Sequence, residues 1–402
     1  MKHLASLAVA SLAVGALVAA ACRSDRIAGP SNPNLTSPAD AVLASRVGPD
    51  GYRLPPPSAP GLRVMTYNVY LGTDLGPIMA APPEAFVAAA TAAYAELQQT
   101  DFPARAGKIA DQIAAVQPDI LALDEVALWS VSANYDITTW PQAPTKPFVT
   151  QYDFVKLVLN ALKARHLNYV AASADTTSDV AAPVVTAFYR AGNPKKFALV
   201  RFQDRDAILV REGVRFRDPQ HGKFAASLPL EALGTALYRG WCSVRATVDR
   251  KTFRFVNSHL EAENADINFA QAQELVGLLQ NEHDPVIWAG DFNADANTDA
   301  PSYALITSAG FTDLWPLAHP RDPGLTNGPA DGVGALGPDG VLVPFTSLVF
   351  NARIDLVLLR DRGEKLREVD AAIFGNKQSD RTASGLFPSD HAAVGMVFEL
   401  PR

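Results

Sequence analysis

The chain has 402 residues, of which 48% are hydrophobic and 19% are charged. This balance is typical of a globular protein with a large core and excludes disorder throughout. The formal net charge of -7 excludes the strongly basic surface of a dedicated duplex-binding protein, so nucleic acid is a possible but not a favoured partner.

The N-terminus has the pattern of an export signal. Lys2 and His3 precede an apolar run at 4–21, which ends at Cys22. Residues 18–22 resemble a bacterial lipoprotein cleavage box, which predicts that 1–21 are removed and that Cys22 becomes a lipidated first residue. Cleavage without a lipid and an uncleaved anchor helix are the alternatives. We expect an exported protein of the bacterial cell envelope, anchored to a membrane by lipid or held in the periplasm, with an extracellular location as a further alternative.

Residues 22–60 are rich in Pro, Ser, Asn and Gly and show no sustained apolar period. This composition predicts a flexible tether. A single domain at 61–402 is the simplest partition of the rest. If Cys22 is lipidated, Cys242 is the one remaining thiol, so no intramolecular disulfide can form. We also expect a monomer.

From residue 61 onward, short β-branched runs alternate with stretches of helical period. Their irregular order favours packed sheets with helices outside over a strictly alternating barrel or doubly wound sheet. A Gly-rich stretch at 328–340 is expected to be a surface loop. In chain order the predicted elements are strand 62–70, helices 84–99 and 103–116, strand 119–123, helix 151–165, strands 167–172, 184–190, 206–210, 241–249 and 252–259, helix 266–281, and strands 285–290, 353–359 and 392–399.

Polar residues gather where predicted strands end, and there a sheet can hold reactive groups on a fixed backbone. Each segment alone has an ordinary explanation, because Asn and Asp commonly cap helices or close turns. Together they supply hard oxygen ligands for a divalent cation, two histidines that can contact phosphate or move protons, and carboxylates to orient them. The six segments are Thr66–Asn68, Leu123–Glu125, Asn257–Glu261, Gly290–Asn293, Arg353–Asp355 and Ser389–His391.

In this order the segments resemble the endonuclease/exonuclease/phosphatase superfamily, which includes deoxyribonuclease I, over residues 63–391. The most specific matches are Gly290–Asn293 and Ser389–His391, reinforced by Arg353–Asp355 at a suitable spacing. The resemblance implies an α/β fold, namely a four-layer α/β/β/α sandwich. Its two packed mixed β-sheets would present their strand ends to one cleft.

The resemblance also implies a metal site. Glu125 resembles the principal metal carboxylate, with Asn68 beside it as a ligand or supporting partner, and Asp390 is similar to the residue that completes or extends the site. A hard cation here, Mg²⁺ or Mn²⁺, would neutralise phosphate charge and polarise the phosphorus–oxygen bond.

Five further residues match catalytic positions of the family. His391 resembles the general base or phosphate contact, with Asp355 as its orienting carboxylate. Asp291 and Asn293 would position the attacking water and a nonbridging oxygen. His259 resembles a second histidine that donates to phosphate in the transition state. Because nucleophile and leaving group must lie in line, such groups are needed on both sides of phosphorus.

Asp124 departs from the family pattern, since many members carry Gln before the metal-binding Glu. Neighbouring strand residues point to opposite faces, so we expect Asp124 to face solvent. An altered choice of metal is the alternative.

Three features bear on the substrate without fixing it. Arg239, in the segment Tyr238–Trp241, is a candidate ligand for a substrate phosphate or headgroup, or else an exposed hairpin arginine. The aromatic segment 126–150 is a lid, a membrane-contact loop or a set of core-packing residues. The basic stretch 201–223 is a solvated hairpin face or a polyanion track.

The resemblance therefore implies an enzyme, a Mg²⁺-dependent phosphoric ester hydrolase acting as a phosphodiesterase or phosphatase in the cell envelope. An exported nuclease and a sphingomyelinase-like phospholipid phosphodiesterase are the alternatives. A noncatalytic tethered binding module is the least favoured reading.

Overall fold

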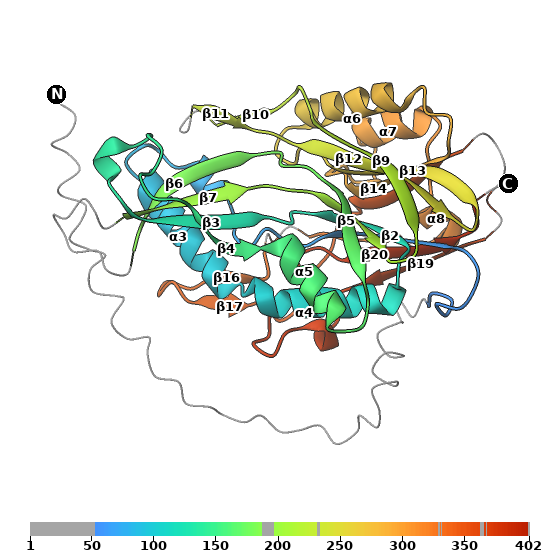
Figure 1. Ribbon diagram of the computed structural model, residues 1–402, viewed down its shortest axis with the longest axis horizontal. Coiled ribbons are helices and arrows are strands. Elements are labelled where there is room, and N and C mark those ends of the chain that lie inside the picture. Colours follow the sequence, from blue (N-terminus) through green and yellow to red (C-terminus); the bar gives the residue numbers. More distant parts are fainter. Residues whose placement is uncertain are drawn as a thin grey trace, which may run out of the picture.

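Two β-sheets lie face to face at the centre of the protein, and helices cover their outer sides (Figure 1). This computed structural model describes residues 53–186, 197–230, 234–328, 330, 332–361, 366 and 368–400. The predicted four-layer sandwich of mixed sheets is confirmed. The leader predicted at 1–21, the lipidation site predicted at Cys22 and the tether as far as residue 52 lie outside the described residues.

The first sheet has the strand order β19-β20-β1-β2-β8-β5. β1 and β2 run parallel, with Asn68 paired beside Asp124 where both strands end. All other neighbours in this sheet are antiparallel. Polar strand ends that are distant in sequence are therefore adjacent. The strands are β1 (Leu62–Asn68), β2 (Ile120–Asp124), β5 (Tyr169–Ala174), β8 (Ala207–Arg211), β19 (Val369–Phe374) and β20 (Ala393–Phe398).

The second sheet repeats this arrangement, with the order β15-β18-β14-β13-β12-β9. β13 and β14 are its parallel pair. β18 runs antiparallel to β14, so that its first residue, Asp355, pairs with Asp291 at the end of β14. The strands are β9 (Arg215–Lys223), β12 (Gly240–Val248), β13 (Lys251–His259), β14 (Val286–Asp291), β15 (Thr312–Asp313) and β18 (Asp355–Arg360).

Alternating side chains along the central strands fill two different apolar layers. In β2, Ile120 and Ala122 pack between the two sheets, whereas Leu121 and Leu123 pack against helices. Both faces of β2 are therefore covered. The helices over the first sheet are α4 (Phe102–Val116) and α5 (Phe154–Lys163), and those over the second are α6 (Ala265–Leu279) and α7 (Pro301–Ser308). The helix α3 (Phe86–Gln99) packs on a third sheet.

The four predicted helices correspond to α3, α4, α5 and α6, and three of them start at a capping side chain. Asp101, Asp153 and Asn264 each accept a hydrogen bond from a backbone N–H in the first turn of α4, α5 and α6 respectively. Such caps satisfy donors that have no partner inside the helix. The predicted start at residue 151 was early, because 151–153 belong to a strand.

A third sheet, with the order β4-β3-β7-β6, extends from the sandwich beside α3 (Figure 1). It contains both ends of the aromatic segment 126–150. Trp129 and Tyr135 are buried, which agrees with the core-packing interpretation for these two residues, whereas Trp140 and Phe148 are only partly buried. The strand expected at 184–190 begins earlier in the structure, and 187–190 lie outside the described residues. The strands are β3 (Leu128–Tyr135), β4 (Val149–Asp153), β6 (Asp179–Val185) and β7 (Phe197–Gln203).

The basic stretch 201–223 is neither a single hairpin face nor a continuous track, because it runs through three different sheets. Arg201, Arg205 and Arg211 each pair with a distant aspartate. Two short hairpins and several short helices complete the described fold, and none of its helices is long and apolar enough to cross a membrane. These elements are α2 (Gly76–Met79), η2 (Ile137–Thr139), β10 (Leu228–Leu230), β11 (Thr235–Leu237), α8 (Trp315–Ala318), β16 (Gly334–Leu336), β17 (Leu342–Pro344) and η5 (Gln378–Asp380).

Candidate active site

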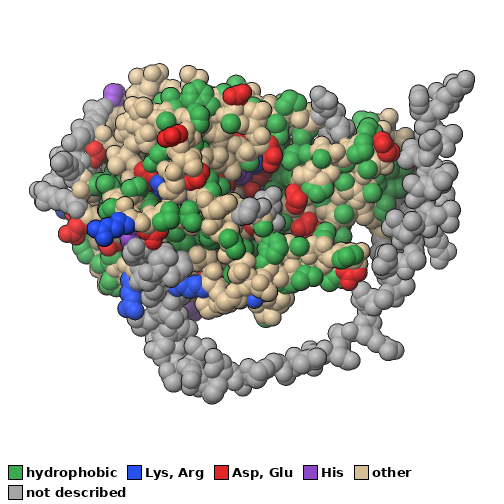
Figure 2. Space-filling model, turned by 180° about the vertical axis from the view of Figure 1, so that it is seen from behind, with side chains coloured by type: hydrophobic (Ala, Val, Ile, Leu, Met, Phe, Trp, Pro, Cys, Tyr) green, Lys and Arg blue, Asp and Glu red, His purple; other side chains and the backbone are tan. Residues whose placement is uncertain are grey.

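The predicted site residues lie together where the parallel strand pairs of both sheets end. Asn68 ends β1, His259 ends β13 and Asp291 ends β14, while Asp355 begins β18. Because each sheet has one parallel pair, four strand ends of the same direction face a common space. On the face seen in Figure 2, acidic side chains gather around a hollow in which a histidine is visible.

Asn68 joins acidic side chains from the two sheets. Its Nδ2 donates to Glu125 Oε1 at 3.2 Å and to Asp291 Oδ2 at 3.0 Å. Its Oδ1 accepts from the backbone N–H of Tyr70 at 3.0 Å, and this bond fixes which end of the amide is nitrogen. Because the amide oxygen is engaged, Asn68 is placed to support two carboxylates rather than to ligate a cation.

Glu125 directly follows β2 with a positive φ of 60°, which turns its side chain away from the direction of the strand. Its Oε2 accepts from the backbone N–H of Leu71 at 2.7 Å, and its own N–H points at Asp206 Oδ1, 3.3 Å away. Burial, followed by the nearby carboxylates of Asp390 and Asp204, raises the pKa of Glu125 to about 7. A cation at this carboxylate would relieve that repulsion.

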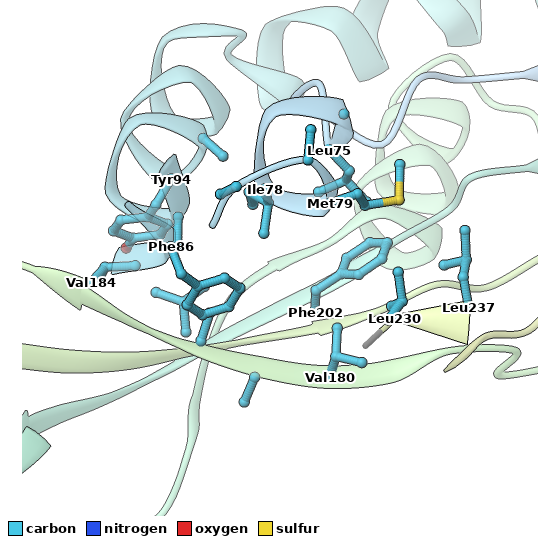
Figure 3. Close-up of a pocket in the computed structure, with 18 of the residues that line it drawn as sticks. Leu75, Ile78, Met79, Phe86, Tyr94, Val180, Val184, Phe202, Leu230 and Leu237 are labelled. Atoms are coloured by element: carbon cyan, nitrogen blue, oxygen red, sulfur yellow. The ribbon is translucent and has the colours of Figure 1, made fainter. Parts of the chain in front are cut away.

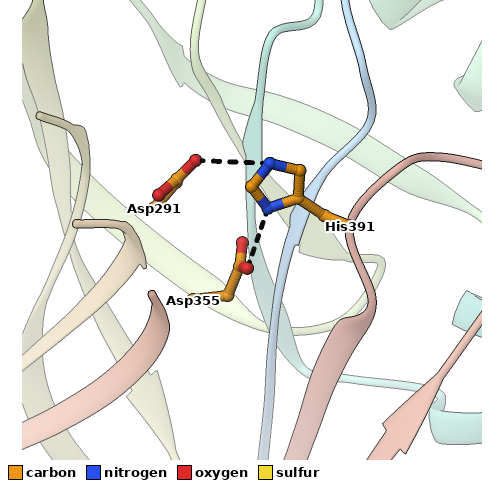
Figure 4. A group of neighbouring side chains, drawn as sticks. All are labelled: Asp291, Asp355 and His391. Atoms are coloured by element: carbon orange, nitrogen blue, oxygen red, sulfur yellow. Dashed lines mark hydrogen bonds and ion pairs between the residues drawn. The ribbon is translucent and has the colours of Figure 1, made fainter. Parts of the chain in front are cut away.

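His391 lies between two carboxylates (Figure 4). Its Nδ1 is 2.9 Å from Asp355 Oδ2, and its Nε2 is 3.7 Å from Asp291 Oδ2. Burial opposes the charged ring, but Asp355 and Asp291 outweigh burial and raise the pKa of His391 well above its usual value. Ligand atoms of these three residues all lie within 4.8 Å of one another. The predicted orientation of His391 by Asp355 is present in this geometry.

His259 occupies the other side of Asp291. Its Nδ1 is 3.0 Å from Arg239 Nη1, and its Nε2 is 3.6 Å from Asp291 Oδ2 and 3.1 Å from Asn293 Nδ2. Burial and the charge of Arg239 hold the pKa of His259 well below its usual value. An arginine can only donate, so Nδ1 accepts and the neutral ring carries its proton on Nε2. In that tautomer the amide nitrogen of Asn293, which donates to Leu260 O, makes no hydrogen bond with Nε2.

Asp390 lies beside this group but has different partners. Its Oδ2 accepts from the backbone N–H of Gly332 at 2.7 Å, and its Oδ1 accepts from Ser389 Oγ at 3.2 Å. Gly332 belongs to the stretch 328–340, which was expected to be only a surface loop. That expectation was wrong, because this segment contains the strand β16 and the buried Val333 as well as the contact to Asp390.

The donor set fits a hard divalent cation. Glu125 and Asp291 both accept from one amide nitrogen, so their oxygens are close together. Asp355 Oδ1 is buried and has no hydrogen-bond partner among the described residues. Carboxylate oxygens are what Mg²⁺ and Mn²⁺ prefer. One group of possible ligands in the described residues consists of Asp291, Asp355 and His391. It differs from the predicted ligand set, which was Asn68, Glu125 and Asp390, but it lies next to Glu125.

Comparison with known proteins identifies the family. The Endonuclease/Exonuclease/phosphatase family profile matches residues 65–391. The chain belongs to this family. In general terms it is a metal-dependent phosphoester hydrolase. A search of curated proteins finds no match.

Solved structures with a similar fold share little sequence with this chain. A family protein from Leptotrichia buccalis C-1013-b is 16% identical, with a TM-score of 0.48 over 84% of this chain and 100% of that one. D. rerio TDP2 complexed with a single strand DNA product is 14% identical, with a TM-score of 0.48 over 85% and 100%. The human Nocturnin catalytic domain with a bound sulfate anion is 16% identical, with a TM-score of 0.41 over 85% and 95%. Similarity at this level says nothing about the substrate.

Asp124, where the family resemblance leads us to expect Gln, does not face solvent. It is completely buried, and its Oδ2 accepts from the backbone N–H of Asp291 at 2.8 Å. Burial, followed by the charges of Asp291 and Asp355, raises its pKa well above the usual value. The expectation of exposure failed because the second sheet covers the face of β2 opposite its helices, so neither face is open to water.

Arg239 is also buried, which excludes the exposed hairpin arginine considered from the sequence. Its side chain is 10% exposed and lies 3.3 Å from Asp204 Oδ2. It also contacts His259 Nδ1, and its Nε is 4.0 Å from Glu261 Oε2. The structure therefore places Arg239 behind His259, among carboxylates.

Several polar residues of the site were not among the predicted ones. Asn327 Nδ2 is 2.8 Å from His391 Nε2, and Asp204 and Asp206 lie behind Glu125 and Arg239. Asp206 begins the predicted strand at 206–210 and Asp204 stands two residues before it, so two close carboxylates at a strand start were a usable signal. Asn327 had no such signal, because it stands in an irregular segment far from any predicted strand end.

Proposed function

We propose that this chain cleaves a phosphodiester or phosphomonoester with Mg²⁺ or Mn²⁺ bound at Glu125 and Asp291. The observation that supports the proposal most is the position of His391 between Asp355 and Asp291, at 2.9 Å and 3.7 Å. An imidazole oriented by one carboxylate beside a group of hard oxygen ligands is suited to proton transfer at a metal-bound phosphate.

When bound, the cation would neutralise phosphate charge and polarise the phosphorus–oxygen bond. Asn68 would hold Glu125 and Asp291 in place for it through the two bonds from its Nδ2. Asp390 would add negative charge beside Glu125 while its own position is kept by Gly332. These residues therefore bind and position, and the proton chemistry belongs to the histidines.

In the proposed reaction, a bound cation would offset the carboxylate charge that raises the pKa of His391, so that the ring can be neutral. Asp355 then accepts from Nδ1–H of His391, and Nε2 faces the reacting group and takes a proton from water. The water oxygen bonds to phosphorus, and the ester phosphorus–oxygen bond breaks on the opposite side. The leaving oxygen takes a proton from solvent, and His391 returns its proton to solvent. Asp291 and Asn293 position the water and a nonbridging oxygen, and His259 donates from Nε2 to the phosphate. Arg239 supports the second histidine, with a substrate phosphate as a further partner.

We propose the cell envelope as the place of action, with a lipid on Cys22 and a flexible tether to a monomeric domain. The apolar run at 4–21 and the Pro-rich segment after it support this. A shift in apparent mass after globomycin-type inhibition of lipoprotein processing, compared with a Cys22→Ala variant, tests the lipid.

The metal assignment is tested by titrating Mg²⁺ and Mn²⁺ into chelator-treated protein while following hydrolysis of an aryl phosphodiester. Glu125→Gln should raise the half-saturating metal concentration by about tenfold, because a neutral amide binds a hard cation less well. Asp299→Asn, at an exposed position, is the matched control and should behave as wild type. Unchanged metal affinity in Glu125→Gln removes Glu125 from the site, and activity that survives chelation removes the metal.

A further inference from the structure

A large apolar cavity lies between the third sheet and the helices α2 and α3. Its volume is about 780 Å³, within the range of roughly 300–1,000 Å³ of typical ligand pockets. Figure 3 shows apolar side chains from the helices and from the strands pointing toward one another across it. Among its described lining residues, Glu263 alone carries a charge.

The apolar wall is one face of the third sheet. Val180 pairs with Phe202, and Phe202 pairs with Trp129, so the three side chains form a row across β6, β7 and β3. Arg201, next to Phe202 on β7, instead forms an ion pair with Asp179. The sheet therefore has a polar face and an apolar face, and the apolar face is only partly covered by α3.

Three lining residues lie close to residues of the active site, through short chains of hydrogen bonds or through sequence. Trp129 Nε1 donates to Leu71 O at 3.0 Å, and the N–H of Leu71 donates to Glu125 Oε2 at 2.7 Å. The backbone N–H of Glu263 donates to Glu261 Oε1 at 2.9 Å. Leu237 stands two residues before Arg239, which contacts His259. These links place the cavity beside the residues of the active site.

We propose that this cavity holds the hydrocarbon chain of the substrate, so that the enzyme acts on a lipid phosphoester whose phosphate lies at Glu125 and His391. The inference rests on the proposed function. A nucleobase or sugar would require polar partners in the wall, whereas the described lining offers mainly alkyl and aromatic surface. Leu230 and Leu237 lie at one end of the cavity in Figure 3, and Tyr94 and Val184 at the other, an elongated shape that suits a chain.

The test uses 4-nitrophenyl alkyl phosphates with methyl, butyl and octyl groups, below their aggregation concentrations. Each buried methylene should favour binding about fourfold. With incomplete burial, we expect kcat/KM to rise about 30-fold from methyl to octyl. Val180→Asp and Ala182→Phe should reduce this rise to threefold or less, by placing charge or bulk in the cavity, and leave the methyl ester unaffected. Arg201→Gln, on the polar face, should keep the full rise.

A flat chain-length profile in the wild type, with the methyl ester hydrolysed, overturns the inference and leaves the hydrolase standing. If neither these diesters nor the monoester 4-nitrophenyl phosphate is hydrolysed, the proposed function fails, and calorimetry with octyl phosphocholine decides about the cavity. If Val180→Asp binds octyl phosphocholine at least tenfold more weakly than the wild type, the hydrocarbon site is supported. If the two proteins bind it equally, the site is refuted. A third outcome is that a peptide of residues 4–21 displaces bound octyl phosphocholine while kcat/KM shows no preference for chain length. That result would assign the cavity to the chain's own apolar leader and would also overturn the inference.

Discussion

The active-site cleft and the apolar cavity at the third sheet are lined by opposite kinds of side chain. At the strand ends of the sandwich, buried carboxylates lie close together. Burial and then the charge of Asp291 raise the pKa of Asp124, and burial raises the pKa of Asp291 to about 6. At the third sheet, Val180, Phe202 and their neighbours leave a space with almost no polar group. The first arrangement holds charge ready for a reaction, and the second can select by size and hydrophobicity alone.

Because of this difference, we expect the sandwich to determine the rate of reaction and the third sheet to determine the preference among substrates. The predicted catalytic residues lie in the sandwich strands or within two residues of them, whereas the third sheet carries none of them. A change in the first region should therefore alter the rate for every substrate equally, while a change in the second should alter only the preference for chain length. The cavity variants above test one half of this statement, and the following variants test the other.

His391→Ala should have the largest effect. Without the imidazole between Asp355 and Asp291, kcat should fall by roughly a hundredfold or more for methyl and octyl esters alike. The octyl-to-methyl ratio of kcat/KM should stay as in the wild type. His283→Ala, which changes an exposed histidine, should leave both values unaltered. Wild-type turnover in His391→Ala would remove His391 from the mechanism.

Glu282→Gln should lower the stability of the fold without changing the active site or the cavity. Glu282 is partly buried, which raises its pKa, but the N–H of Asp284 and the guanidinium groups of Arg245 and Arg254 outweigh burial and hold its pKa at about 2. A lowered pKa stabilises the fold above the unfolded value near 4.5, and this contribution disappears as pH falls through about 2.

We therefore expect Glu282→Gln to lower the free energy of unfolding by about 2 kcal/mol at pH 7, with a smaller difference at pH 3.5. Urea unfolding at both pH values measures this. Activity per folded molecule and the chain-length preference should not change. A difference that grows toward acid would contradict the assigned partners of Glu282.

Trp129→Phe should have the smallest effect, and it should affect both the active site and the cavity. It keeps an aromatic ring in the cavity but removes the bond from Nε1 to Leu71 O, worth about 1 kcal/mol. Because Leu71 also holds Glu125, kcat/KM should fall about fivefold or less for all esters. A change confined to the octyl ester would show that Trp129 acts on the chain only.

The sandwich and most of the site could be predicted from sequence because both depend on local signals. Apolar strands that end in Asn, Asp or His carry their reactive group and its support in one segment, as in Gly290–Asn293. The third sheet gave no such signal, because β3 gains its partner β7 from about 70 residues further along the chain. Asp124 was misplaced for a related reason, since nothing local shows that both faces of β2 are covered.

Gly332 has a practical consequence for work on this protein. A Cβ there would lie 2.9 Å from the hydroxyl of Tyr70, and its backbone N–H holds Asp390. The segment around it looks like an ordinary connection in sequence, yet an affinity tag or fluorophore inserted there would displace an acidic group of the cleft. The exposed turn at Asp249 and Arg250, between β12 and β13 on the sandwich, is the safer place for a label.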